Sequence, residues 1–72
     1  MTRNNLRRIR RQQRFSIRGL SVAAHVSTAT IIAVELYGAV PAARTRRKLA
    51  KALYVMELTI WPSLDSEGEH AR

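Results

Sequence analysis

Apolar residues recur along this chain at intervals of three and four, and no stretch alternates strictly between apolar and polar positions. Intervals of three and four place side chains on one face of an α-helix, whereas strict alternation is typical of strands. The pattern therefore predicts an all-α fold. Breaks in the pattern divide the chain into five helices.

The first helix is predicted to begin near Leu6 and to end before Phe15. Three residues share its inner face: Leu6, Ile9 and Gln13. Ser16 then suits an N-cap, because its hydroxyl can accept a hydrogen bond from a free amide of the next turn. A second helix is expected from about residue 17 to residue 24, with two residues on its inner side: Leu20 and Ala24.

The third helix is predicted to follow an N-cap at Ser27 and to end at Gly38, since serine favours helix starts and glycine favours helix ends. Its inward side is expected to carry Ile31, Val34 and Glu35. A fourth helix is predicted over about 43–53, with an inner side made of Thr45, Leu49, Ala52 and Leu53. A short fifth helix is expected over about 56–60, and Pro62 ends it.

These helices form one predicted domain, residues 1–62, with a flexible Arg-rich start at 1–5. Residues 63–72 are polar and acidic and are expected to be disordered. In a chain of 72 residues the core rarely supplies more than about 3–5 kcal/mol. We therefore expect very efficient helix packing or a partner subunit.

The net charge of +8 comes from two separate basic segments. Residues 1–18 hold seven Arg and no acid, and residues 44–51 hold five basic residues. Such a concentration favours a polyanionic partner, either nucleic acid or an anionic membrane surface, over a merely solvated face. The most apolar stretch, Val26 to Val40, contains Glu35 and is shorter than the roughly 20 residues of a membrane span. A surface-bound membrane peptide is disfavoured because the apolar residues fit a multi-helix core rather than one stripe.

Catalytic and metal-binding constellations are missing from the sequence. The chain has no Cys, and its two histidines, His25 and His70, are too far apart for a His-based metal site. No Ser, His and acid stand together, and no Gly-rich loop precedes a helix. We expect a protein that is not an enzyme and has no metal or cofactor, and the lack of Cys fits a reducing cytoplasm.

Two short helices joined by a tight turn, centred on "LSVAAHVSTATIIAVE", have helix-turn-helix spacing. The chain carries "FSIRGLS", "HVSTATIIAVELYG", "P" and "TRRKLAKALYV" in one collinear order. Over about residues 6–55 this set resembles the Cro/cI-type (XRE-like) helix-turn-helix family of phage and bacterial repressors. The ending "IWPSLD" is similar to that of Ner-like phage regulators.

The resemblance implies a lambda-repressor-like bundle of five helices that binds double-stranded DNA. It implies a transcriptional regulator, most often a repressor, that reads a pseudo-palindromic operator as a homodimer. Such a protein is bacterial or phage-encoded, cytoplasmic and associated with the nucleoid. An antitoxin-type regulator is the alternative role within the same fold.

The resemblance also places Arg10 and Glu35 at positions that form a buried ion pair between the first and third helices. Glu35 is the only acid before residue 57, and its burial without a partner is expected to be strongly destabilising. The alternative is that Glu35 caps a helix or is solvated.

Carried over by the same resemblance, a further set of residues is assigned to the DNA backbone: Arg3, Ser16, Arg18, Ser27, Arg44 and Arg47. Arg3 belongs to the flexible arm, which is expected to reach along the DNA backbone or into a minor groove. The arginines are expected to neutralise phosphates, and the alternative for them is a solvated face. Ile17 stands where the family has a contacting Gln, so that contact is lost. His25 stands where the family has Gly and a left-handed conformation is needed.

The outward face of the third helix is assigned to the major groove through Thr28, Ala29, Ile32 and Ala33. It lacks the Arg, Lys, Asn and Gln side chains that read G or A with two hydrogen bonds. Specificity is then expected from thymine methyl contacts and DNA shape. A competing hypothesis makes this helix a protein interface through an exposed apolar patch of Ile32, Leu36, Tyr37 and Val40. Trp61 is expected to cap the core, with a dimer or partner contact as the alternative.

Overall fold

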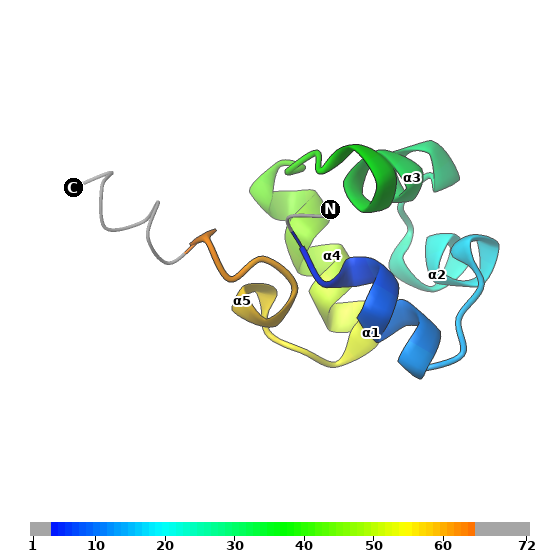
Figure 1. The fold of residues 1–72 in the computed structure, drawn as a ribbon. Helices are drawn as coiled ribbons and strands as arrows, with labels where there is room; N and C mark the ends of the chain where they lie inside the picture. Colours follow the sequence, from blue (N-terminus) through cyan, green and yellow to red (C-terminus); the bar gives the residue numbers. More distant parts are fainter. Residues whose placement is uncertain (1–3, 65–72) are drawn as a thin grey trace.

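A computed structural model describes residues 4–64, and in that range the chain forms five α-helices (Figure 1). They are α1 (Leu6–Gln12), α2 (Ile17–Ala24), α3 (Thr28–Tyr37), α4 (Ala43–Leu53) and α5 (Glu57–Ile60). The predicted all-α fold is confirmed, and the expected limits of α2 and α4 are confirmed to the residue. In this part of the chain, no helix is long and apolar enough to cross a membrane.

Serine side chains begin α2 and α3, as the sequence predicts. Ser16 Oγ accepts a hydrogen bond from Gly19 N at 2.8 Å, and Ser27 Oγ accepts one from Thr30 N at 3.1 Å. Ser27 Oγ also donates to Thr30 Oγ1 at 2.9 Å. Both hydroxyls therefore satisfy amides that would otherwise be unpaired at the helix start.

Left-handed residues stand at both ends of the segment that holds α3. His25, after α2, has φ 57° and ψ 45°, which confirms the left-handed conformation expected there. Gly38, after α3, has φ 68°. Arg14 and Tyr54 also have positive φ, a feature that the sequence pattern did not reveal.

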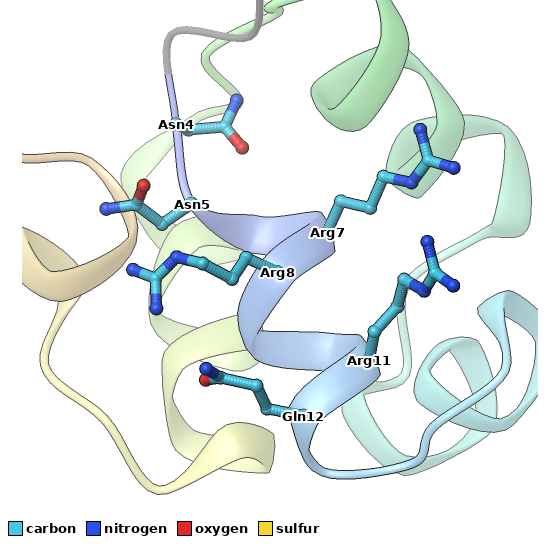
Figure 2. Close-up of a pocket in the computed structure, with 6 residues that line it drawn as sticks. All are labelled: Asn4, Asn5, Arg7, Arg8, Arg11 and Gln12. Atoms are coloured by element: carbon cyan, nitrogen blue, oxygen red, sulfur yellow. The ribbon is translucent and has the colours of Figure 1, made fainter.

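The start of the described chain is tied down, which corrects the predicted flexibility of residues 4 and 5, both drawn in Figure 2. Asn4 is buried; its Nδ2 donates to Val34 O at 2.9 Å and its Oδ1 accepts from Leu6 N at 3.0 Å. Asn5 N donates to Ile60 O at 2.8 Å. Hydrogen bonds to α3 and α5 thus fix residues 4 and 5. The remaining residues of the predicted arm, including Arg3, lie outside the described residues.

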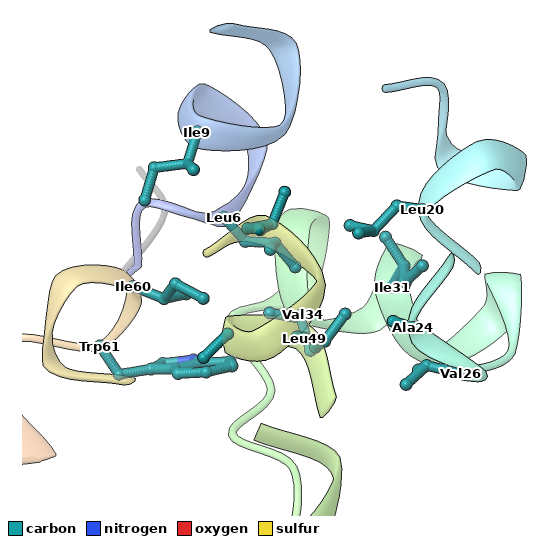
Figure 3. Packing of buried hydrophobic residues seen from close by; sticks show 12 residues of the cluster. Leu6, Ile9, Leu20, Ala24, Val26, Ile31, Val34, Leu49, Ile60 and Trp61 are labelled. Atoms are coloured by element: carbon teal, nitrogen blue, oxygen red, sulfur yellow. The ribbon is translucent and has the colours of Figure 1, made fainter. Parts of the chain in front are cut away.

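Side chains from all five helices meet in one apolar core (Figure 3). Its members are Leu6, Ile9, Leu20, Ala24, Val26, Ile31, Val34, Leu49, Ala50, Leu53, Ile60 and Trp61. Of the predicted inner side of α4, Leu49 and Leu53 are buried, Thr45 and Ala52 are half-buried, and Ala50 was not predicted.

Trp61 fills the core beside α5, and its exposed fraction is 1%. The capping role expected for it is confirmed, and the alternative of a dimer contact is dropped because its own chain covers the indole. Leu64 packs against the same core, and its N–H donates to Trp61 O at 3.1 Å. The domain therefore reaches at least Leu64 rather than ending at residue 62. The rest of the predicted tail, 65–72, lies outside the described residues.

Candidate nucleic-acid interface

A buried ion pair holds α3 against α1. Arg10 Nε donates to Glu35 Oε2 at 2.7 Å, and Arg10 Nη2 donates to Glu35 Oε1 at 3.1 Å. Arg10 Nη1 donates to Phe15 O at 2.7 Å, so the same guanidinium also holds the turn between α1 and α2. The two side chains are 10% and 2% exposed. The predicted pair is confirmed, and a solvated Glu35 is wrong.

This two-pronged contact matters because a guanidinium and a carboxylate match each other in one plane. It fixes the rotation of α3 about its axis as well as its distance from α1. Ile31 and Val34 complete the inward side and are fully buried. The orientation of the outward side of α3 is therefore set by contacts of the inward residues.

The outward side of α3 carries the residues predicted to meet the major groove. Thr28 and Ala29 are exposed, whereas Ile32 and Ala33 are half-buried. The Thr28 hydroxyl is the one side-chain hydrogen-bonding group among these four residues. The neighbouring hydroxyls of Ser27 and Thr30 bond to each other, which leaves them committed to the cap.

Exposed arginines stand on the first turns of α2 and α4. Arg18 is the second residue of α2, while Arg44 and Arg47 are the second and fifth residues of α4. All three are exposed. Ser16 and Ser27, which were also assigned to the DNA backbone, are exposed but have their hydroxyls in caps. Their place in an interface would come from their position beside free amides.

Within residues 4–64 there are two carboxylates, and both are paired. Glu35 binds Arg10, and Glu57 Oε1 accepts from Arg46 Nε at 3.1 Å. Arg46 Nη1 also donates to Pro41 O at 2.8 Å, which ties α4 to the preceding loop. This second pair was not predicted, because Arg46 is one of five basic residues in the segment 44–51 and nothing in the sequence singles it out. The other cations of the described chain form no ion pair with a carboxylate of residues 4–64.

The outer side of α1 forms an open basic hollow (Figure 2). It is lined by Asn4, Asn5, Arg7, Arg8, Arg11 and Gln12. Arg7 and Arg11 lie one turn apart and extend to the same side of α1, whereas Arg8 extends to the other side. The sequence predicted a basic block here but assigned none of these side chains to a site. The charge run was the available signal; the hollow depends on how Asn4 and Asn5 are tied down.

A smaller hollow lies between the end of α2 and α4, and two lysines contribute to it, Lys48 and Lys51. Lys48 Nζ lies 3.5 Å from His25 O, the carbonyl of the left-handed residue that ends α2. A cation at the C-terminus of a helix is favourable. Lys48 is therefore a structural contact of α2 as well as part of the positive surface.

The predicted partner patch is exposed. Leu36, Tyr37 and Val40 are 59%, 80% and 51% exposed and stand within five residues at the end of α3. Tyr54 and Met56, between α4 and α5, are exposed as well. Ile32, the fourth residue of the predicted patch, is half-buried.

No model of a known protein family matches the chain, and no curated protein sequence matches it. The resemblance to the Cro/cI-type family therefore stays a prediction.

Proposed function

We propose that this protein is a small, non-catalytic regulator of transcription that binds double-stranded DNA with α3 in the major groove. It would act as a repressor in the cytoplasm of a bacterium, and it would be encoded by the bacterium or by a phage. There it would be bound to the DNA of the nucleoid. The observation that carries the proposal is the setting of α3. The Arg10–Glu35 pair fixes this helix from inside, and exposed arginines that form no ion pair with a carboxylate of residues 4–64 stand near the starts of α2 and α4.

The geometry of a DNA groove explains why α3 would contact bases while residues of α2 and α4 would contact phosphates. The major groove is wide enough to admit one helix, and rows of phosphates border it on both sides. Arg18 and the free amides at the start of α2 would hold one row, while Arg44 and Arg47 would hold phosphates near α4. These contacts set the register of the protein, and residues of α3 then contact the bases.

The basic side of α1 would add to this binding through its field. Arg7, Arg8 and Arg11 face no carboxylate in the described chain, so they attract DNA over about a Debye length, roughly 8–10 Å at moderate salt. Attraction of this kind raises the rate of encounter and does not depend on base sequence. Arg3, which is outside the described residues, belongs to the same segment.

A homodimer on a pseudo-palindrome is part of the proposal. Two copies with a two-fold axis would present two α3 helices to half-sites about one turn of DNA apart, roughly 34 Å. The small core supports this reading, because a second subunit adds binding energy that one copy lacks. Sedimentation of the protein at micromolar concentrations tests it, and a monomer at all concentrations with and without DNA would contradict it.

The experiment that tests DNA binding is a titration with duplex DNA at several salt concentrations. If five phosphates are neutralised per subunit, log K should fall against log salt with a slope of roughly −4 to −5. Changing Arg44 and Arg47 together to Gln should make this slope shallower by about two. A specific regulator also keeps a preferred sequence in the presence of excess random competitor.

Arg46→Gln is the matched control, since it removes one charge from the same helix. Arg46 is already paired with Glu57, so its loss should change the slope by less than half of the change per residue seen with Arg44 and Arg47. Equal effects at all three positions would show that only net charge matters. Binding that is salt-dependent but indifferent to sequence would remove the regulator proposal.

A second candidate role is favoured by the exposed patch at the end of α3. Leu36, Tyr37 and Val40 offer apolar area of the kind that protein contacts use, as in an antitoxin-type regulator or an interaction module. The double variant Tyr37→Ser and Val40→Ser separates the roles. A DNA-reading protein keeps its salt slope per subunit, whereas a module that associates through this patch loses its assembly in sedimentation.

A further inference from the structure

The outward face of α3 is made almost entirely of methyl groups. Ala29 and Ala33 carry one methyl each, Ile32 carries two, and Thr28 carries a methyl beside its hydroxyl; Thr28 and Ala29 are exposed, and Ile32 and Ala33 are half-buried. No residue of this set can form the paired hydrogen bonds that identify guanine or adenine. The next hydroxyls, on Ser27 and Thr30, are already bonded to each other.

The major groove offers one apolar group that can match such a face, the methyl on C5 of thymine. In 5-methylcytosine the same methyl stands at the same ring position, whereas cytosine and uracil lack it. The two methylated bases differ in the group at C4, an acceptor in thymine and an amino donor in 5-methylcytosine. An apolar side chain that contacts only the methyl group does not distinguish these two bases, unless it also covers the C4 group.

We propose that α3 recognises C5-methylated pyrimidines through apolar contact, so that 5-methylcytosine can replace thymine where α3 touches DNA. This inference rests on the proposed DNA-binding function and names what the same site reads. At these positions cytosine and uracil are rejected equally, because both leave a gap in place of the methyl. The protein is then a sensor of cytosine methylation at sites that match its preferred sequence.

The positions of the four residues on α3 allow them to contact methyl groups of neighbouring bases together. Thr28 and Ile32 are four residues apart, as are Ala29 and Ala33, so each pair lies on one side of the helix. The short side chains of the two alanines allow the helix backbone to come close to the bases. The rotation of α3 is fixed by the Arg10–Glu35 pair, so the methyl groups are held in place before DNA arrives.

The expected size of the effect is small at each position and adds over several. Burial of one methyl group contributes about 0.8 kcal/mol, which is about a fourfold change in affinity. Two or three methyl contacts in each half-site would therefore give a clear preference.

The first experiment uses three pools of random-sequence duplex DNA with the full-length protein. One pool is unmodified, one has thymine replaced by deoxyuridine, and one has cytosine replaced by 5-methyldeoxycytidine. The unmodified pool should enrich a sequence with thymine at defined positions. From the methylcytosine pool, the protein should enrich sequences with either thymine or 5-methylcytosine at those positions. From the deoxyuridine pool, it should show no preference for deoxyuridine there.

The second experiment takes one duplex enriched from the unmodified pool and changes single bases. Deoxyuridine at a contacted thymine should weaken binding about fourfold. A pair of 5-methylcytosine and guanine at that position should bind within twofold of the original, and unmethylated cytosine should bind at least fourfold more weakly. These changes are in the DNA, so they do not depend on the folding of a variant.

A protein variant then links the effect to α3. Ala29→Gly removes one methyl from an exposed position, so the penalty for deoxyuridine at its partner base should fall to less than twofold. Met56→Ala is the control, because Met56 is 70% exposed but lies between α4 and α5. It should leave every deoxyuridine penalty unchanged, and circular dichroism checks that both variants are folded.

The outcomes separate the two proposals. If the unmodified pool enriches a sequence but deoxyuridine has no effect at any position, methyl recognition is overturned and DNA reading stands. It is also overturned if 5-methylcytosine binds as weakly as cytosine at every thymine position. If no pool enriches any sequence, the proposed function fails, and methyl recognition fails with it.

Discussion

The two sides of α3 differ in a way that reverses the usual distribution of residues. The inward side holds the one charged residue of the helix, Glu35, and the outward side is apolar apart from Thr28 and the tyrosine hydroxyl at its end. Surface helices normally bury apolar residues and expose charged ones. The difference shows that contacts of its inward side position α3, while its outward side carries no charge.

An uncharged outside is useful beside DNA only if other elements supply the positive charge. In this molecule α1, α2 and α4 supply it, and the two carboxylates of the described chain are consumed by Arg10 and Arg46. The helix that would lie deepest in the groove then needs no ionic contact. This comparison predicts that changes on the inward side destroy the fold and that changes on the outward side leave it intact.

The largest expected effect comes from removing the buried carboxylate. Glu35→Ala leaves the Arg10 guanidinium buried with one remaining partner, the carbonyl of Phe15. Breaking a buried pair in this way costs about 3–5 kcal/mol, comparable to the whole stability of so small a core. The variant should be largely unfolded at 25 °C by circular dichroism.

Glu57→Ala is the control for that experiment. Its pair with Arg46 is partly exposed, with side-chain exposures of 21% and 31%, so the loss should be at most about 1 kcal/mol. The double change Arg10→Met with Glu35→Leu should recover part of the stability, because apolar residues can replace a buried pair. A Glu35→Ala protein as stable as Glu57→Ala would contradict the structural role of the pair.

The next effect compares two neighbouring isoleucines on opposite sides of α3. Ile31 is fully buried, so Ile31→Ala should lower the free energy of unfolding by about 3 kcal/mol through a cavity. Ile32 is half-buried, and Ile32→Ala should cost about 1 kcal/mol. Urea denaturation measures both. If the order is reversed, the assignment of inward and outward sides is wrong.

The smallest expected effect on stability comes from the left-handed residues at the two ends of the segment that holds α3, His25 and Gly38. Gly38 has φ 68° and nothing within 4 Å of an added Cβ, so Gly38→Ala tests backbone strain alone. It should cost about 1 kcal/mol, a fall in Tm of about 4–8 °C. His25→Gly should gain up to about 0.5 kcal/mol, since glycine relieves the same strain but loses more entropy on folding. Thermal unfolding measures both, and a gain in Tm for Gly38→Ala would contradict the strain argument.

Much of the fold was predictable because its helix limits are marked locally. Ser16 and Ser27 begin helices by bonding to amides three residues on, and Gly38 ends one by adopting positive φ. Such signals act within a few residues of sequence. The inward residues of α3 and the Arg10–Glu35 pair were also predicted, the pair with help from a resemblance and from the isolation of Glu35 in the sequence.

The remaining features depend on contacts between distant segments. Gln13 Nε2 donates to Leu53 O at 2.7 Å across 40 residues, and Asn4 reaches Val34 across 30. Neither residue type carries a sign of its partner. The basic hollow on α1 was missed for the same reason, because Asn4 and Asn5 looked like part of a flexible arm. Local patterns fix helix limits; polar ties between helices emerge only when the chain is folded.

The tie between Asn5 and α5 has a consequence for the time at which the protein folds. Asn5 N bonds to Ile60 O, and Asn5 Nδ2 bonds to Thr59 O across 54 residues. Contacts of such separation form slowly, because the intervening chain must be ordered first. During synthesis α1 leaves the ribosome before α5, to which it is anchored. The nascent chain therefore carries its exposed arginines into the cell before the core can close around Trp61.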